Sequence, residues 1–252
     1  MHVDINCDLG EGTTSADDEN DRQLLELVTS ANLACGLHAG DPYRMWSTIE
    51  TARRNGVALG AHVSYNDRPN FGRVVVERSR DELVADILYQ LGSIAALAKA
   101  QGATISYVKP HGALYNRIVT DEAHAQAVAE AITIFDPSLK LLTLPGSVAE
   151  QRATQMGVEV RREGFADRGY HSDGTLVARS HPGAIITDPE TVAQRGRDLV
   201  CKQELTTIEG DVISLGVDSL CIHSDTPGAV ALARRLRSEL ESNNVSIRPF
   251  VP

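Results

Sequence analysis

Short apolar segments alternate with helical patterns along the whole chain, and this alternation limits the fold more than any other feature. Seven segments have the length and composition of strands: residues 2–6, 30–35, 57–61, 105–108, 140–144, 158–162 and 219–222. A helical stretch between consecutive strands favours parallel pairing, because a parallel crossover needs a long connection. We therefore expect one β/α-barrel domain over residues 1–252, closed or nearly closed by seven strands. A doubly wound open sheet is the alternative.

Capping residues place several helix starts. Asp41 stands before Pro42, a favourable first helical residue, and Ser79 with Glu82 forms a capping box. A third helix is expected to begin near residue 21, and the last one at Thr226. Two further extended stretches are expected at residues 206–215 and 245–250.

Polar side chains gather where the predicted strands end. In a β/α barrel the C-terminal ends of the strands meet at one rim, and that rim holds the active site. The residues at or just beyond these ends are Asn6, Asp8, His38, His62, Lys109, His111, Glu163, Asp167, Arg168, His223 and Asp225. Helix capping alone does not explain polar residues at six of seven strand ends. The pattern therefore predicts an active site at this rim.

Charge and composition exclude several classes of protein. The net charge of −10 argues against a nucleic-acid binder and against docking to anionic membranes. We expect no membrane span, because no run approaches about 20 apolar residues, and no signal peptide. The four cysteines form no C-x-x-C pair and are expected to be buried and reduced, as in a cytoplasmic protein.

Several strings of residues resemble one known family. They are DINCDLGEG, ACGLHAGDP, GAHVSYNDRPNFGR, VKPHGALYN, EGFADRGY and CIHSDTPGAV, in this order between residues 4 and 230. They resemble the LamB/YcsF family, whose members serve as the A subunit of bacterial ATP-dependent 5-oxoprolinase. The chain departs from the usual family pattern at Val63, Asn66, Asn70, Val74, Ala178 and Ser224. These departures touch loops and leave the His, Lys, Asp and Glu set intact.

The resemblance implies both a fold and a reaction. The fold would be a seven-stranded β/α barrel like that of glycoside hydrolases and polysaccharide deacetylases. The reaction would open the lactam of 5-oxo-L-proline to L-glutamate, coupled to ATP hydrolysis. A lactam is a poor electrophile, and phosphorylating its amide oxygen would activate it. Such chemistry needs cations for developing negative charge, a base for water and an anchor for the substrate carboxylate.

On this resemblance the rim residues receive roles. Lys109 and Arg168 would be the cations, although Lys109 could instead pair with a neighbouring acid. Asp8 is the first candidate for the general base, and Glu163 or Asp225 could replace it. Asp225 could equally cap the last helix. His111 joins the catalytic set, and the expected substrate-binding residues are Asn6, His38, His62, Asp167, Arg168 and His223.

The histidines also allow a metal site. A deacetylase-like fold would suggest that Asp8, His38 and His62 bind a divalent metal, with His111 or His223 as other possible ligands. The sequence holds no H-x-x-x-H or H-E-x-x-H spacing that would support this arrangement. Histidines that only make hydrogen bonds are the competing interpretation.

Nucleotide binding and partners remain open on sequence alone. Neither G-x-x-x-x-G-K-[ST] nor a strand followed by G-x-G-x-x-G occurs, so ATP would bind unconventionally or on partner subunits. The resemblance names these as oxoprolinase subunits B and C, and homo-oligomers are also possible. Two other functions compete: a metal-dependent deacetylase of a sugar or small amide, and a non-catalytic metabolite-binding subunit. An aromatic content of 4% is low for gripping a polysaccharide.

Overall fold

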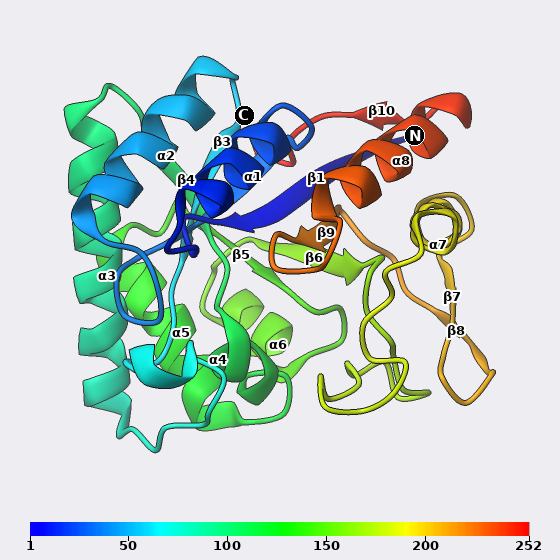
Figure 1. Ribbon diagram of the computed structural model, residues 1–252. Coiled ribbons are helices and arrows are strands. Elements are labelled where there is room, and N and C mark those ends of the chain that lie inside the picture. The colour runs from blue at the N-terminus through cyan, green and yellow to red at the C-terminus, as the bar shows by residue number, and fades with distance from the viewer. Residues whose placement is uncertain (252) are drawn as a thin grey trace.

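Seven parallel strands pair in the order β1–β2–β3–β4–β5–β6–β9, and β9 pairs back with β1 (Figure 1). The computed structural model describes residues 1–251. The barrel strands are β1 His2–Leu9, β2 Ser30–Ala34, β3 Ala58–His62, β4 Ile105–Val108, β5 Lys140–Thr143, β6 Val160–Phe165 and β9 Ser219–His223. The pairing of β1 with β9 closes the barrel, so the seven-stranded fold is confirmed and the open-sheet alternative is wrong.

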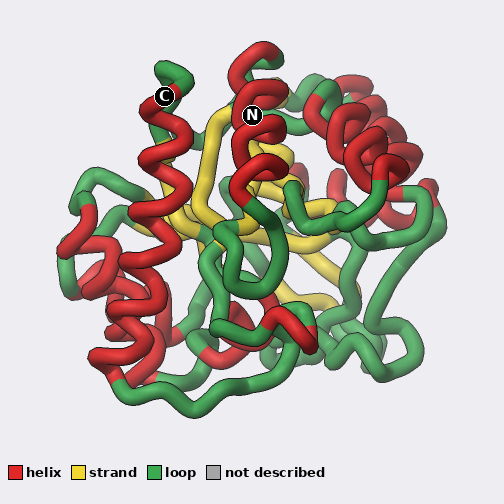
Figure 2. Tube along the Cα trace, turned by 60° about the vertical axis from the view of Figure 1, so that its left-hand side comes forward, coloured by secondary structure: helices red, strands yellow, loops and turns green. Residues whose placement is uncertain are grey.

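Helices surround the strands on the outside of the barrel (Figure 2). The long ones are α1 Ser15–Leu25, α2 Pro42–Arg54, α3 Arg80–Ala100, α5 Glu122–Phe135, α6 Val148–Gln155, α7 Pro189–Cys201 and α8 Ala229–Ser242. Shorter elements are η1 Arg68–Asn70, α4 Gly112–Arg117, the antiparallel pair β7 Glu204–Thr206 and β8 Val212–Ser214, and β10 Ser246–Ile247. The last of these pairs with the start of β1.

Capping explains where the helices begin. Asp41 accepts hydrogen bonds from two backbone N–H groups of α2, and Ser79 forms the expected capping box of α3. Two predicted starts are wrong. α1 begins earlier than residue 21, because Thr14 forms its own capping box. α8 begins after Gly228, later than Thr226.

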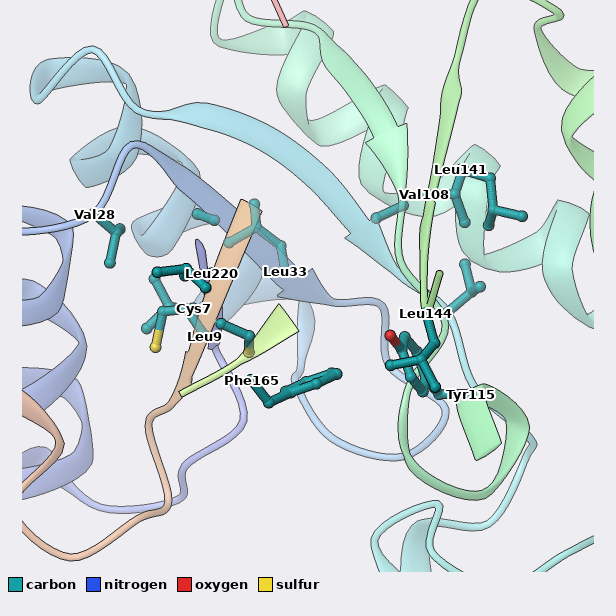
Figure 3. Close-up of a cluster of buried hydrophobic side chains, with 14 of the residues drawn as sticks. Cys7, Leu9, Val28, Leu33, Val108, Tyr115, Leu141, Leu144, Phe165 and Leu220 are labelled. Carbon is teal, nitrogen blue, oxygen red and sulfur yellow. The ribbon is translucent and has the colours of Figure 1, made fainter. Parts of the chain in front are cut away.

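The hydrophobic core lies between the barrel and the helices. Side chains alternate along a strand, so Val3, Ile5, Cys7 and Leu9 of β1 all pack into this core. Figure 3 shows Cys7 and Leu9 beside side chains from neighbouring strands, among them Leu33 of β2 and Leu220 of β9. Each large apolar side chain buried here contributes roughly 1.5–3 kcal/mol to folding.

The other face of β1 fills the barrel with polar groups. Asp4 accepts hydrogen bonds from the hydroxyls of Thr29, Ser30 and Ser219. Burial raises the pKa of Asp4 to about 6, although these hydroxyls oppose the shift. Asn6 forms the next layer and Asp8 the one after it, closest to the rim. The barrel interior is therefore a hydrogen-bonded polar column that leads up to the rim residues.

Helix α3 corrects one expectation. By length and composition it could cross a membrane, contrary to the prediction that no segment could. One stripe of this helix, with Leu83, Ile87, Leu91 and Ile94, is buried in the core, and α3 packs against α5. A helix of the barrel core can therefore have the length and apolar composition of a membrane-spanning helix.

Candidate active site

A cavity of about 250 Å³ opens at the C-terminal ends of the strands. Seven of the predicted site residues line it: Asp8, His62, Lys109, His111, Arg168, His223 and Asp225. Four others, Asn6, His38, Glu163 and Asp167, are buried and do not line this cavity. The rim predicted from the sequence is therefore one continuous site with a wall and a layer of supporting side chains behind it.

Lys109 forms the floor of the cavity. Its Nζ lies 2.8 Å from Asp8 Oδ1, 2.8 Å from Glu163 Oε1 and 3.1 Å from Cys221 Sγ. Burial is the largest single influence and would lower the pKa of the ammonium, but the carboxylates of Asp8 and Glu163 act together with the Cys221 sulfur and raise the pKa well above its ordinary range. Lys109 is thus a permanent cation at the base of the site, paired with two acids as one sequence interpretation expected.

Asp8 is the acid best fixed in position. Its Oδ1 accepts hydrogen bonds from Lys109 Nζ and from Asn32 Nδ2, and its Oδ2 lies 3.4 Å from His62 Nε2. Burial opposes ionisation, yet His62 and Lys109 hold the pKa of Asp8 well below its ordinary range. The carboxylate is therefore ionised and accepts a proton poorly, which weakens its candidacy as general base.

Asn6 and Glu163 support Lys109 from behind. Asn6 Oδ1 lies 3.2 Å from Lys109 Nζ, while Asn6 Nδ2 donates to Ser219. Glu163 is fully buried, and burial together with this carboxyl group raises the pKa of the neighbouring Tyr115 hydroxyl. On β1 every second side chain faces the barrel interior, and Asn6 is the inward-facing residue just before Asp8. Asn6 therefore lies one layer deeper than the cavity wall, where a substrate-binding residue was expected.

Asp167 and His223 form a hydrogen-bonded pair. Both carboxylate oxygens of Asp167 lie 3.1 Å from His223 Nδ1, and one also accepts from the His223 backbone N–H and the Thr226 hydroxyl. The His223 ring stacks on Phe165, with centroids 5.4 Å apart. With Nδ1 engaged by Asp167, Nε2 is the nitrogen left for a molecule in the cavity. This geometry resembles the acid–histidine half of a proton-transfer site.

Three histidines and Glu11 converge beside Asp8. Their inner ligand atoms, contributed by Glu11, His38, His62 and His111, all lie within 4.8 Å of one another. Burial lowers the pKa of His38 to about 3, and the carboxylates of Asp8 and Glu11 outweigh burial to raise the pKa of His62. The expected metal set of Asp8, His38 and His62 is thus not the one that the structure groups together. His38 Nε2 lies 2.8 Å from Glu11 Oε1. Glu11 was not among the metal ligands expected from the sequence.

A second group that could hold a metal consists of Asp8, Cys221 and His223. Here the ammonium of Lys109 lies within 2.8 Å of Asp8 and 3.1 Å of the Cys221 sulfur. A cation therefore already contacts two of these three groups, so the histidine and Glu11 group fits a metal better.

The mouth of the cavity carries two arginines that the sequence interpretation missed. Arg73 and Arg179 both pair with Asp225, and all three are partly exposed. Asp225 therefore joins two loops, and its interpretation as a helix cap is wrong because Gly228 takes the N-cap position of α8. Arg168, the expected cation, donates to the carbonyls of Ala184 and Val177 and so holds a loop in place.

Comparisons with known proteins show the family to which the chain belongs. Residues 3–252 match the LamB/YcsF family. The chain belongs to the LamB/YcsF family. A curated relative from Symbiobacterium thermophilum, the A subunit of 5-oxoprolinase, is 47% identical over 97% of this chain and 94% of its own length. The protein of the same name from Corynebacterium jeikeium is 46% identical over 100% of this chain and 97% of its own length.

A solved structure extends the comparison to three dimensions. The lactam utilization protein from Thermus thermophilus superposes on this family member with a TM-score of 0.93 and 42% sequence identity. The match covers 99% of this chain and 100% of that structure. The two proteins therefore share the overall fold over nearly their whole length.

Proposed function

We propose that this LamB/YcsF protein is the A subunit of a 5-oxoprolinase and opens the lactam of 5-oxo-L-proline to L-glutamate. Curated relatives with that name match it over nearly their whole length at 46–47% identity. The observation that carries the proposal is one small cavity whose wall brings together a proton-transfer histidine, a buried cation and ionised acids. At about 250 Å³ it suits a metabolite and lies below the roughly 300–1,000 Å³ typical of larger ligand pockets.

We assign proton transfer to His223. Its Nε2 is available to the cavity, and Asp167 acts as a positioning residue by fixing the other ring nitrogen. This histidine replaces Asp8 as first candidate for the general base, since the pKa of Asp8 is held too low for efficient proton transfer. Asp8 keeps a role in orienting water or substrate beside Lys109, and His111 completes the wall.

Electrostatic stabilisation falls to Lys109 and the mouth arginines. Lys109 would stabilise negative charge that develops on the amide oxygen, because a fixed cation in a water-poor site acts strongly on such charge. Arg73 and Arg179 would anchor the substrate carboxylate, in place of Arg168, two of whose nitrogens bind loop carbonyls. Substrate binding would then compete with Asp225 for the two arginines.

ATP is proposed to bind wholly or partly on subunits B and C. The sequence contains no recognised phosphate-binding loop, and the cavity is small for a nucleotide beside a lactam. A complex of the three subunits would act in the cytoplasm. Free cysteines, three of them buried, suit that reducing compartment.

The test measures glutamate released from 5-oxoproline and ATP by the full chain, alone and with subunits B and C. We expect release only from the combination, and a fall of at least about 100-fold in kcat for His223→Gln. The control is His171→Gln, since His171 pairs with Glu209 on a loop outside the cavity.

Two outcomes would contradict the proposal. Full turnover by both His223→Gln and Asp8→Asn would make the chain a non-catalytic binding subunit. Robust ATP-dependent release of glutamate by the isolated chain would refute the dependence on partner subunits.

A further inference from the structure

Two rim histidines each donate a hydrogen bond from the ring nitrogen that points away from the histidine and Glu11 group, here called the outer nitrogen. His62 Nδ1 lies 2.9 Å from the carbonyl oxygen of Lys109, and His111 Nε2 lies 2.8 Å from the carbonyl oxygen of Phe71. A carbonyl oxygen can only accept, so each of these nitrogens carries the proton. In the neutral ring the other nitrogen is then a bare lone pair. For both histidines that lone pair faces inward.

His38 follows the same logic through a hydroxyl. Its Nδ1 lies 2.9 Å from Ser64 Oγ, and that hydroxyl donates its own proton to the carbonyl of Tyr65. Ser64 therefore accepts from His38, whose Nε2 is left as the inward lone pair. Three histidines from three different strand ends thus bring their inner nitrogens within 4.8 Å of one another, with the rings of His38 and His111 stacked at a centroid distance of 3.9 Å.

The inward atoms face one another with nothing but acceptors among them. His38 Nε2 is 2.8 Å from Glu11 Oε1, and His111 Nδ1 is 3.0 Å from His62 Nε2 and 3.1 Å from Glu11 Oε1. His62 Nε2 is 3.6 Å from the same oxygen. The carboxylates of Asp8 and Glu11 favour a proton on His62, and a proton shared between His62 and His111 would satisfy that pair alone. It would leave the lone pair of His38 against the Glu11 carboxylate.

We propose that Glu11, His38, His62 and His111 bind one divalent transition-metal ion. One cation at their centre would satisfy all four groups together once the stacked rings of His38 and His111 tilt toward it. Zinc binds imidazole nitrogen at about 2.0–2.1 Å, which places tetrahedral ligands about 3.3 Å apart. In four of the six pairs of these atoms the distances of 2.8–3.6 Å bracket that value, and all six pairs lie within 4.8 Å. The outer contacts to carbonyls and a hydroxyl are those that orient metal-bound histidines in proteins.

The surrounding backbone holds the ligands rigidly. Phe71, whose carbonyl orients His111, has a left-handed φ of 56°, an uncommon conformation for a residue with a side chain. At Gly72 a Cβ atom would lie 2.8 Å from His38 Cβ and 2.9 Å from His111 Cδ2, so only glycine fits there. Asp21 accepts a hydrogen bond from the N–H of Gly10 and fixes the turn that presents Glu11.

The bound ion would lie beside the proposed reaction site. Glu11, His62 and His111 all line the cavity. Metal binding can nevertheless be measured without substrate or partner subunits, so this inference does not rest on the proposed function. A protein that opens the lactam without a metal would fail the metal titration and pass the glutamate assay. A metal-binding protein without that activity would do the reverse.

The first experiment titrates Zn²⁺ into the full, metal-stripped chain without an affinity tag, against a chromophoric chelator. We expect one Zn²⁺ per chain, and at least about 100-fold weaker binding for Glu11→Gln and His38→Gln, beyond the 10–100-fold cost of losing an outer contact. His171→Gln is the control and should bind like the wild type. Uptake well below one equivalent by the wild type, or unchanged binding by Glu11→Gln, would overturn the proposal.

A second measurement uses only the wild-type chain, in case the variants do not fold. Nitrogen NMR of the imidazoles should show His62 protonated at Nδ1 and His111 at Nε2, with the inner nitrogens shifting when Zn²⁺ is added. Inner resonances that stay unchanged at saturating Zn²⁺ would refute the site. An imidazolium at His62 that persists with Zn²⁺ present would show that a proton holds the group together.

Discussion

Removing the ammonium from the cavity floor should destabilise the whole barrel. In Lys109→Met the long unbranched side chain remains, but Asp8 and Glu163 lose the cation that lies 2.8 Å from each. Breaking a buried ion pair by deleting one partner costs roughly 3–5 kcal/mol. For a chain of this size each kcal/mol lowers Tm by about 2–4 °C. The variant should therefore melt roughly 6–20 °C below the wild type.

Thermal and urea unfolding of the variant measure this loss, and two further variants locate its cause. Lys202→Met removes an exposed ammonium that pairs with Asp198, and it should cost at most about 1 kcal/mol. Adding Glu163→Gln to Lys109→Met should recover part of the lost stability, because one of the two unpaired acids becomes neutral. A Lys109→Met protein within about 1 kcal/mol of the wild type would refute the assignment of Lys109 as the buried counter-ion.

Three further predictions concern other parts of the site and barrel. Asp167→Asn should lower kcat of the three-subunit complex by about 100- to 10,000-fold with little change in KM, because the substitution disturbs the orientation of His223. Equal changes in kcat and KM would contradict this prediction. Asp4→Asn should remove a stability loss of about 3 kcal/mol between pH 4 and pH 8, measured by urea unfolding. Because the pKa of Asp4 is raised to about 6 in the folded protein, the wild type loses stability as the pH rises from 4 to above 6. Parallel plots of unfolding free energy against pH for wild type and variant would contradict this prediction. Gly72→Ala should lose roughly 2–5 kcal/mol from left-handed strain plus steric overlap, whereas Gly174→Ala, with φ +83° and open space, should lose only about 1–2 kcal/mol.

The barrel could be predicted because local patterns decide most of it. Apolar strands alternate with capped helices, and polar residues follow the strands, so both the rim and most of its side chains are visible in the sequence. An ion pair with a neighbouring acid was also predicted from the sequence, as the alternative to a catalytic role for Lys109. In β1 the alternation of Asp4, Asn6 and Asp8 carried the signal for a polar barrel interior, which the sequence interpretation did not use.

Other site residues depend on how loops return to the rim. Glu11 follows Gly10, whose left-handed φ of 74° turns the chain back toward the histidines, and its acidic side chain after Asp8 was the available signal. Arg73 and Arg179 come from loops that have no periodicity, so their meeting with Asp225 depends on tertiary structure. The helix-cap interpretation of Asp225 failed for the same reason.

The most direct test of the central claim is a crystal structure of this chain with 5-oxoproline bound. We expect the lactam ring in the rim cavity, with its amide group near Lys109 and His223 and its carboxylate toward Arg73 and Arg179. Density for the lactam outside this cavity, with the cavity filled only by solvent at saturating ligand, would contradict the assignment of the rim as the site of lactam opening.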